Sequence, residues 1–240
     1  MTAPAGDLYV EINKEGKTVL PNGRFITPPG LTHEVAPHPY GLVLSPDGSI
    51  AVTSNSGTNP LSISILRDIT SEKPEIQQIP PGPSTDEGVL ASVFMGLAIS
   101  NDNSSVYVAG GQENKIFIFD MRNGDPQGYI DCAFVDAEHD YSHGYIGDMV
   151  LSKDGQTLYA VDQINFRMII IDVEQKMILH NVPVGRYPFG ITLSPDNKKA
   201  YVANVGMFAY QKIKGIYPEN LKDTGLEFPP FGYNLSLIHI

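Results

Sequence analysis

The residues best suited to metal chemistry lie in one short polar segment in the middle of the chain. It reads Glu138-His139-Asp140-Tyr141-Ser142-His143, and Asp148 follows shortly after. Two histidines four positions apart share one face of a helix, and nearby carboxylates could complete a shell of metal ligands. Gly144 and Gly147 oppose a stable helix, however. A divalent metal bound by His139 and His143 is one interpretation, and the sequence favours the other, a polar loop.

Other catalytic chemistry finds little support in the sequence. There is no G-x-S-x-G nucleophile motif, and the glycine pair Gly110-Gly111 opens no helix that could hold a phosphate. Cys132 is the only cysteine, which excludes an intrachain disulfide. Asp131 beside it is expected to raise the pKa of the thiol and so to disfavour a reactive thiolate. Apart from the possible metal, the sequence indicates no cofactor.

An internal repeat indicates which strands and turns hold these residues in place. Four times the chain gives a short apolar stretch that opens with glycine, a Ser-x-Asp-x turn and a second apolar stretch. The copies open at Gly41, Gly96, Gly147 and Gly190. Their spacing of about 40 to 55 residues fits one four-stranded β-propeller blade per copy. The sequence therefore predicts an all-β fold, a β-propeller with about four blades present.

Each copy predicts the same order of strands. The first strands, almost wholly apolar, are Leu42–Leu44, Leu97–Ile99, Met149–Leu151 and Ile191–Leu193. The second strands are Ile50–Ser54, Val106–Ala109, Leu158–Val161 and Ala200–Ala203. Third strands are expected at Leu61–Leu66, Lys115–Asp120 and Met168–Asp172, and the best fourth strand is Met177–Val184. In the last copy no third strand is expected, and Pro74–Val89 and Asp131–Tyr145 are interpreted as loops.

The aspartates of the repeated turns are interpreted as structural. Asp47, Asp102, Asp154 and Asp196 recur because the turn recurs. In such a turn the aspartate accepts hydrogen bonds from its own downstream backbone, and the Gly or Asn that follows tolerates a positive φ.

The best candidates for ligand binding flank the innermost strand of each blade, where propeller ligands meet at a central channel. By repeat position these residues are His38, Tyr40, Met95, Tyr145, Asp148, Arg186 and Phe189, with Phe94 beside Met95. An Arg, an Asp and a His that face one funnel would bind a small polar or anionic ligand. The alternative, which the sequence favours, is that the aromatic members pack between blades.

Composition excludes two classes of partner. The chain has 240 residues and a net charge of −11, with no basic run, so nucleic-acid binding is not expected. No apolar stretch approaches the roughly 18 residues of a membrane span. The N-terminus shows neither the basic region nor the apolar core of a signal peptide.

Two segments, Pro39-Tyr-Gly-Leu-Val-Leu-Ser-Pro-Asp-Gly48 and Pro188-Phe-Gly-Ile-Thr-Leu-Ser-Pro-Asp-Asn-Lys-Lys-Ala-Tyr-Val-Ala-Asn204, resemble the YVTN-type β-propeller repeat. The resemblance covers Pro37 to about Phe208. Asn101 and Lys153 replace the turn proline, which weakens individual blades but not the resemblance. Members of this family usually have seven blades, so the resemblance implies an incomplete ring.

The segment Thr18–Gly30 and the insertion after Asn204 resemble one subgroup of this family. In that subgroup the propeller precedes an alkaline-phosphatase-superfamily phosphoesterase domain, and the protein is exported. The resemblance therefore implies export to the periplasm or the cell exterior. It also implies a partner, the C-terminal catalytic domain of the same chain.

The sequence divides into four parts. Residues 1–36 hold a hairpin through Pro21-Asn-Gly whose strands could close the ring, and residues 37–205 hold the four blades. Residues 206–234 are interpreted as a long insertion in the fourth blade. Residues 235–240 read Leu-Ser-Leu-Ile-His-Ile, which is the translation of a common transposase-based sequencing adaptor, and are interpreted as a read-through artefact of a fragment.

Three functions are compatible with the sequence. The favoured one is a non-catalytic binding or scaffold propeller, the N-terminal part of an exported phosphoesterase-type protein. The second is a lactonase-like or dehydrogenase-like propeller enzyme, which needs acids, histidines or metal ligands converging from at least three blades. The third is an exported adhesion or cell-wall propeller.

Overall fold

The computed structural model describes residues 3–13, 16–27, 30–56, 61–81, 93–206 and 234–239, the last of these as backbone only. It divides into two units, Met1–Val35 and Ala36–Ile240, which are described separately. All the regular elements in the described ranges are strands. Accordingly, the described ranges contain no helix with the length and hydropathy of a membrane span.

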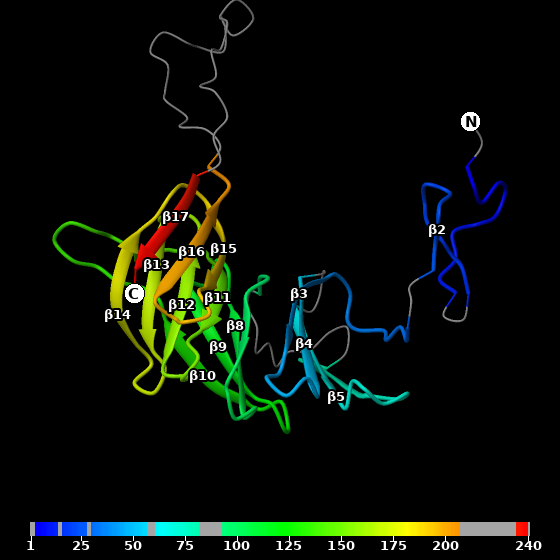
Figure 1. Cartoon of the computed structure of the whole chain (residues 1–240), viewed down its shortest axis with the longest axis horizontal. Coiled ribbons are helices and arrows are strands. Elements are labelled where there is room, and N and C mark those ends of the chain that lie inside the picture. The colour runs from blue at the N-terminus through cyan, green and yellow to red at the C-terminus, as the bar shows by residue number, and fades with distance from the viewer. Residues whose placement is uncertain are drawn as a thin grey trace, which may run out of the picture. The chain divides into compact units, whose positions relative to one another are not determined.

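The larger unit consists of consecutive antiparallel sheets (Figure 1). The first three have four strands each: β3 (Pro39–Leu44) to β6 (Glu75–Ile79), β7 (Leu97–Ile99) to β10 (Pro126–Asp131), and β11 (Ile146–Leu151) to β14 (Met177–Pro183). The strands between them are β4 (Ile50–Asn55), β5 (Ser62–Arg67), β8 (Ser105–Ala109), β9 (Lys115–Asp120), β12 (Thr157–Asp162) and β13 (Arg167–Asp172). The fourth sheet pairs β15 (Pro188–Leu193), β16 (Lys199–Asn204) and β17 (Asn234–His239). The predicted fold, an all-β incomplete propeller with one blade per repeat, is confirmed.

Three strands differ from the prediction. Glu75–Ile79 forms β6 inside the expected loop Pro74–Val89, and Pro126–Asp131 forms β10, for which no strand was predicted. Both are outer strands. The side chains of β10 are mostly exposed, and those of β6 are exposed or partly buried except for Ile79, so neither strand has the apolar pattern of a buried strand. The fourth blade does have a third strand, because the backbone of β17 pairs with β16 from Lys199↔His239 to Asn204↔Asn234. The adaptor origin of residues 235–240 stays a prediction, and the insertion 206–234 lies almost wholly outside the described residues.

The Ser-x-Asp turn has the same hydrogen bonds in all four blades. The serine hydroxyl donates to the aspartate carboxylate at 2.6 Å and accepts the backbone N–H five residues later. The residue after the aspartate has a positive φ in every copy: Gly48 (71°), Asn103 (57°), Gly155 (75°) and Asn197 (55°). The structural interpretation of the turn aspartates is confirmed.

Three apolar cores lie between neighbouring blades. The first joins Val52, Ile63 and Ile65 of blade 1 to the inner and middle strands of blade 2. The second joins Ile116 and Ile118 of blade 2 to blade 3, and the third joins blade 3 to blade 4. Burying apolar side chains in this way is the main favourable contribution to folding. Because each core needs two blades, a blade is stable only beside a neighbour.

The first blade presents an uncovered strip on the side away from blade 2. Leu42 and Leu44 of β3 are 69% and 54% exposed. The residues at the same repeat positions in blade 2, Leu97 and Ile99, are 7% and 6% exposed because blade 1 covers them. The exposed strip is therefore an inter-blade contact surface without its neighbour in the described part of the chain.

The smaller unit contains the predicted hairpin. Strand β1 (Thr18–Val19) pairs with β2 (Phe25–Ile26) through a turn at Pro21-Asn-Gly, and Glu11 forms a bridge to Val19. The hairpin itself is confirmed. Its role in closing a ring stays a prediction.

Candidate functional site

The four inner strands line a common groove, which faces the central channel of the propeller. Strand β11 contacts β7 on one side and β15 on the other, and β3 contacts β7. The groove has a volume of about 640 Å³. It is lined by Val43, Leu44, Pro46, Leu97, Ala98, Ile99, Asn101, Asp148, Met149, Val150, Leu151, Ser152, Lys153 and Ile191. Strands from all four blades therefore contribute to one site.

Most of this lining is apolar, and its two charged residues lie at opposite ends of one strand. Lys153 belongs to the turn that follows β11, where its carbonyl accepts a hydrogen bond from Asn101 at 2.8 Å. Asp148 lies near the start of β11. Five residues of extended chain separate them by about 16 Å. The Asp148 end of the groove thus carries a carboxylate among apolar residues.

Asp148 stands where the other repeats have glycine. In β3 and β15 the ladder skips one residue, then resumes at Gly41↔Ser54 and Gly190↔Ala203. In β11 the corresponding skip lies between Ile146 and Met149, so the position before Met149 is occupied by Asp148. Sequence reasoning took Gly147 as the equivalent glycine. The bulge is the same in β3, β11 and β15. Counted back from the turn serine, Asp148 and not Gly147 occupies the glycine position of the repeat, and it places a carboxylate in the groove.

The carboxylate of Asp148 joins blades 3 and 4. Its Oδ2 accepts the N–H of Ile191 in β15 at 3.0 Å, and its Oδ1 accepts the N–H of Met149 at 2.9 Å. Burial raises the pKa of Asp148 above its ordinary value, and these two hydrogen bonds only partly oppose that effect.

Aromatic rings from all four blades gather at the Asp148 end of the inner strands. The Phe94 ring is central, with its centroid 5.6 Å from Tyr40, 5.1 Å from Tyr145 and 6.2 Å from Phe189. Tyr40 and Phe189 are the skipped residues of β3 and β15, so the bulges turn these side chains toward the cluster. The rings pack in tilted and edge-to-face geometry, as aromatic pairs prefer.

The structure brings together only some of the predicted channel residues. Tyr40, Tyr145 and Phe189 meet around Phe94, and Asp148 lines the groove. His38 and Arg186 are exposed and do not line the groove. His38 has a positive φ of 59°, like its repeat equivalent Tyr187 at 50°, and its carbonyl accepts the N–H of Ser56. The backbone carbonyl of Met95 lies against Gly41, where no Cβ would fit.

The candidate metal ligands lie in a loop. The segment is not helical, and Val135 bridges Asp140 across it. His139 Nδ1 lies 3.2 Å from Asp136 Oδ1. In the part of the chain that the structure describes, no three His, Cys, Asp or Glu side chains gather closely enough to share a metal ion. The metal site at His139 and His143 stays a prediction.

A buried ion pair holds this loop, and sequence reasoning missed it. Arg167 donates to Asp162 Oδ2 at 3.0 Å, and these side chains are 1% and 0% exposed. The same guanidinium donates to the Cys132 carbonyl at 2.7 Å and stacks over Tyr141 at 4.2 Å. Asp162 and Arg167 are cross-strand partners in the hairpin of β12 and β13. Their opposite charges, five residues apart on either side of a turn, were the signal that the sequence offered. The negative charge of Asp162 is thus balanced by Arg167 inside the protein, and its role is structural.

Cys132 lies in an environment that disfavours the thiolate. Its side chain is fully buried, and burial raises the pKa of the thiol far above its usual range. The carboxylates of Asp162 and Asp131 contribute further to that rise. Burial therefore opposes formation of a thiolate at Cys132 more strongly than Asp131 does, and the absence of a reactive thiolate stays a prediction.

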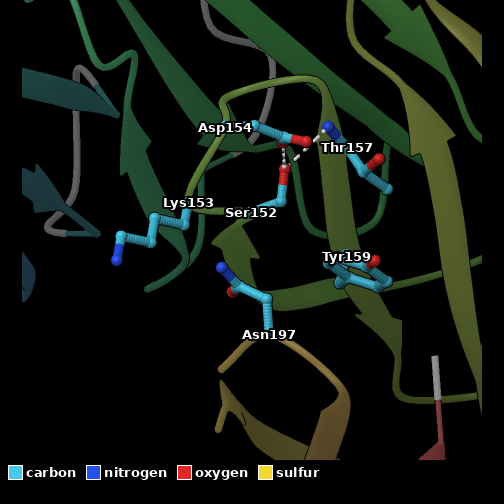
Figure 2. Close-up of a pocket in the computed structure, with 6 residues that line it drawn as sticks. All are labelled: Ser152, Lys153, Asp154, Thr157, Tyr159 and Asn197. Atoms are coloured by element: carbon cyan, nitrogen blue, oxygen red, sulfur yellow. Dashed lines mark hydrogen bonds between the residues drawn. The ribbon is translucent and has the colours of Figure 1, made fainter. Parts of the chain in front are cut away.

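A second, more polar groove of about 450 Å³ lies between the turns of blades 3 and 4 (Figure 2). Ser152, Lys153, Asp154, Thr157, Tyr159 and Asn197 line it. The dashed lines in Figure 2 show Ser152 bonded to both Asp154 and the N–H of Thr157, so these groups serve the turn itself. The central groove is the better candidate because it draws on four blades.

The blades and their channel define this chain as a β-propeller protein. No protein-family model matches the sequence, and no curated protein sequence matches it. The similarity to solved structures is one of fold.

Among the similar solved structures is hydrazine synthase of Kuenenia stuttgartiensis, with a TM-score of 0.54 and 19% identity over 75% of this chain and 46% of that one. The periplasmic gluconolactonase PpgL of Pseudomonas aeruginosa has a TM-score of 0.52 and 19% identity, over 79% of this chain and 55% of that one. The WD40 repeats of RRP9 have a TM-score of 0.53 and 14% identity, over 72% and 46%. The chain therefore spans about half the length of the propellers that it matches.

Proposed function

We propose that this chain is a non-catalytic binding module whose ligand site is the central groove. The observation that carries the proposal is the groove itself, lined by the inner strands of all four blades. The aromatic rings that pack around Phe94 lie at the start of the same strands. A largely apolar cavity with few polar groups is the usual form of a small-molecule site.

The chemistry of the groove supports binding over catalysis. Among its lining residues, Asp148 is the single acid, and none is a histidine or cysteine. A propeller enzyme would need several such groups from different blades to transfer protons or hold a metal.

The same proposal covers the longer protein of which this propeller is a part. By its repeat and its N-terminal segment, the chain is the propeller of an exported, phosphoesterase-type protein, and that catalytic domain is its partner. The test is to extend the reading frame beyond Asn234. Further blades followed by a domain with clustered Asp and His metal ligands are expected, and a stop soon after the last blade would contradict this context.

Binding in the groove can be tested with a tryptophan, because the chain has none. Leu44 lines the groove and is 54% exposed, so Leu44→Trp places a reporter there with little disturbance. The control is Tyr129→Trp, at a half-exposed position on the outer strand β10. Three probes that share a branched head are titrated: 3,3-dimethylbutanol, 3,3-dimethylbutanoate and choline. Saturable change at position 44 and none at 129 is expected with at least one probe, and no change with any probe would refute the proposal.

The second candidate is a lactonase-like enzyme, which the similarity to the periplasmic gluconolactonase PpgL favours. In that case Asp148 is the general base of the groove. The chain should then hydrolyse glucono-δ-lactone, and Asp148→Asn should abolish the activity while the thermal melt is retained. Absence of hydrolysis by the folded chain rejects this candidate.

A further inference from the structure

Asp148 is partly buried, and unlike the two well-buried carboxylates in the described residues it has no cation beside it. Asp162 is paired with Arg167, and Asp120, 6% exposed, is paired with Arg122 at 2.9 Å. In the described ranges no lysine, arginine or histidine lies within ion-pair distance of Asp148. A partly buried carboxylate without a counter-ion is costly, and such groups are common at functional sites.

The fold does not require a carboxylate at this position. Glycine occupies it in the other three blades, at Gly41, Gly96 and Gly190. The neighbouring junction between blades 2 and 3 is linked by a backbone bond from the N–H of Gly96 to the carbonyl of Gly147. The carboxylate is therefore an addition to a scaffold that closes without it.

The surroundings of Asp148 suit one kind of ligand. Two carboxylate lone pairs bind backbone N–H groups, and a carboxylate has further lone pairs to offer. Phe189 directly precedes Gly190, and Phe94 lies two residues before Gly96. These two glycines lie close to Asp148, so both rings belong to the same end of the inner strands, although neither lines the groove itself. A carboxylate and aromatic rings that share one end of a site can together attract an alkylated ammonium group, through charge and cation–π interactions.

We infer that the Asp148 end of the central groove binds a small organic cation, an alkylated ammonium whose apolar part lies along the inner strands. This inference rests on the proposed binding function and replaces the anionic ligand expected from the sequence. Lys153, the other charged residue that lines the groove, lies about 16 Å along the strand, so Asp148 is the one charged lining residue at this end.

The experiment uses the Leu44→Trp chain and the same three probes. Choline and 3,3-dimethylbutanol have the same shape and differ in charge, and 3,3-dimethylbutanoate keeps the branched head but carries a carboxylate at the other end. Choline should bind at least about tenfold more tightly than 3,3-dimethylbutanol, and 3,3-dimethylbutanoate should bind most weakly. Asp148→Asn should remove the preference for choline, because the asparagine keeps an oxygen for the N–H of Ile191 but loses the charge. Glu174→Gln, an exposed charge change in the same blade, should leave the preference unchanged.

The outcomes separate the two proposals. Equal binding of choline and the neutral probe, or tighter binding of the anion, overturns the cation inference but leaves groove binding intact. A preference for choline that survives in Asp148→Asn also overturns the inference. Failure of all three probes refutes groove binding and the inference together, provided that thermal melts show each variant to be folded.

Discussion

Two aspartates in blade 3, Asp148 and Asp162, have different roles because different groups contact their carboxylates. Asp162 is fixed by a guanidinium and belongs to the framework, whereas Asp148 meets only backbone N–H groups and the groove. Their chemistry is identical, so only the partner distinguishes a structural carboxylate from a binding one.

The first prediction at this scale concerns pH. Because burial raises the pKa of Asp148, the native chain binds this proton more tightly than the unfolded chain does. The contribution of Asp148 to stability is therefore present below the ordinary pKa of 3.8 and is lost as pH rises through the raised native pKa. The gain in melting temperature from Asp148→Asn should be larger at pH 7.5 than at pH 4.5, as measured by circular dichroism. A gain that does not depend on pH would contradict the assignment.

The second prediction concerns the buried ion pair. Arg167→Met leaves the Asp162 carboxylate buried without its cation, which should lower the free energy of unfolding by about 3 to 5 kcal/mol. Arg122→Met is the comparison. Arg122 also pairs with a buried aspartate, Asp120, but the Arg122 side chain is 82% exposed, so water can take its place. That change should fall within about 1 kcal/mol. Urea titration of both variants makes the comparison, and equal losses would show that the Arg167 network is not essential.

At the scale of elements, the turn is the most regular feature of the chain. Its aspartates have lowered pKa values, about 2 for Asp47 and Asp102, because the turn serine donates its hydroxyl to each carboxylate. Hydrogen bonds to the ionised form therefore stabilise the turn at neutral pH. That stabilisation is lost as pH falls from 3.8 toward 2.

A substitution at Asn197 tests the turn directly. Its φ of 55° lies in the left-handed region, where a β-branched side chain is strained. Asn197→Val should therefore destabilise the chain by about 1 to 2 kcal/mol, whereas Asn197→Gly should be nearly neutral. Thermal or urea unfolding measures both. Equal stability of the two variants would contradict the repeated geometry of the turn.

The elements also show what the sequence could and could not predict. Inner and middle strands followed from the repeat, since their apolar residues are buried between blades. The outer strands β6 and β10 were not predicted, because strands that stay partly exposed need no alternation of apolar and polar residues. At the site, the aromatic positions were predicted from the repeat. The lack of a cation beside Asp148 and the contacts of Arg167 with Cys132 and Tyr141 depend on which segments become neighbours, and local patterns do not contain that information.

At the scale of the whole molecule, the described blades form half of a typical matched propeller. Leu42 and Leu44 form an exposed apolar strip in the described part of the chain, whereas their equivalents in blade 2 are covered by blade 1. An exposed apolar strip of this kind promotes association.

The chain on its own should therefore self-associate. Leu42→Glu with Leu44→Glu should raise the monomer fraction in analytical ultracentrifugation, because charges on the strip oppose contact. Leu179→Glu, at a position 47% exposed on the outer strand β14, is the control and should change little. A monodisperse, cooperatively melting parent chain would contradict the prediction.

The reach of Arg167 also has a consequence for the order of events during synthesis. Its guanidinium binds the carbonyl of Cys132, which was added to the chain 35 residues earlier. At a ribosomal rate of about 5 to 20 residues per second, the segment that leaves blade 2 waits about 2 to 7 seconds for this bond. The segment around Cys132, which leaves blade 2, therefore gains this hydrogen bond only after the third strand of blade 3 has been synthesised. The contact between these two blades is completed about 35 residues after Cys132 is added.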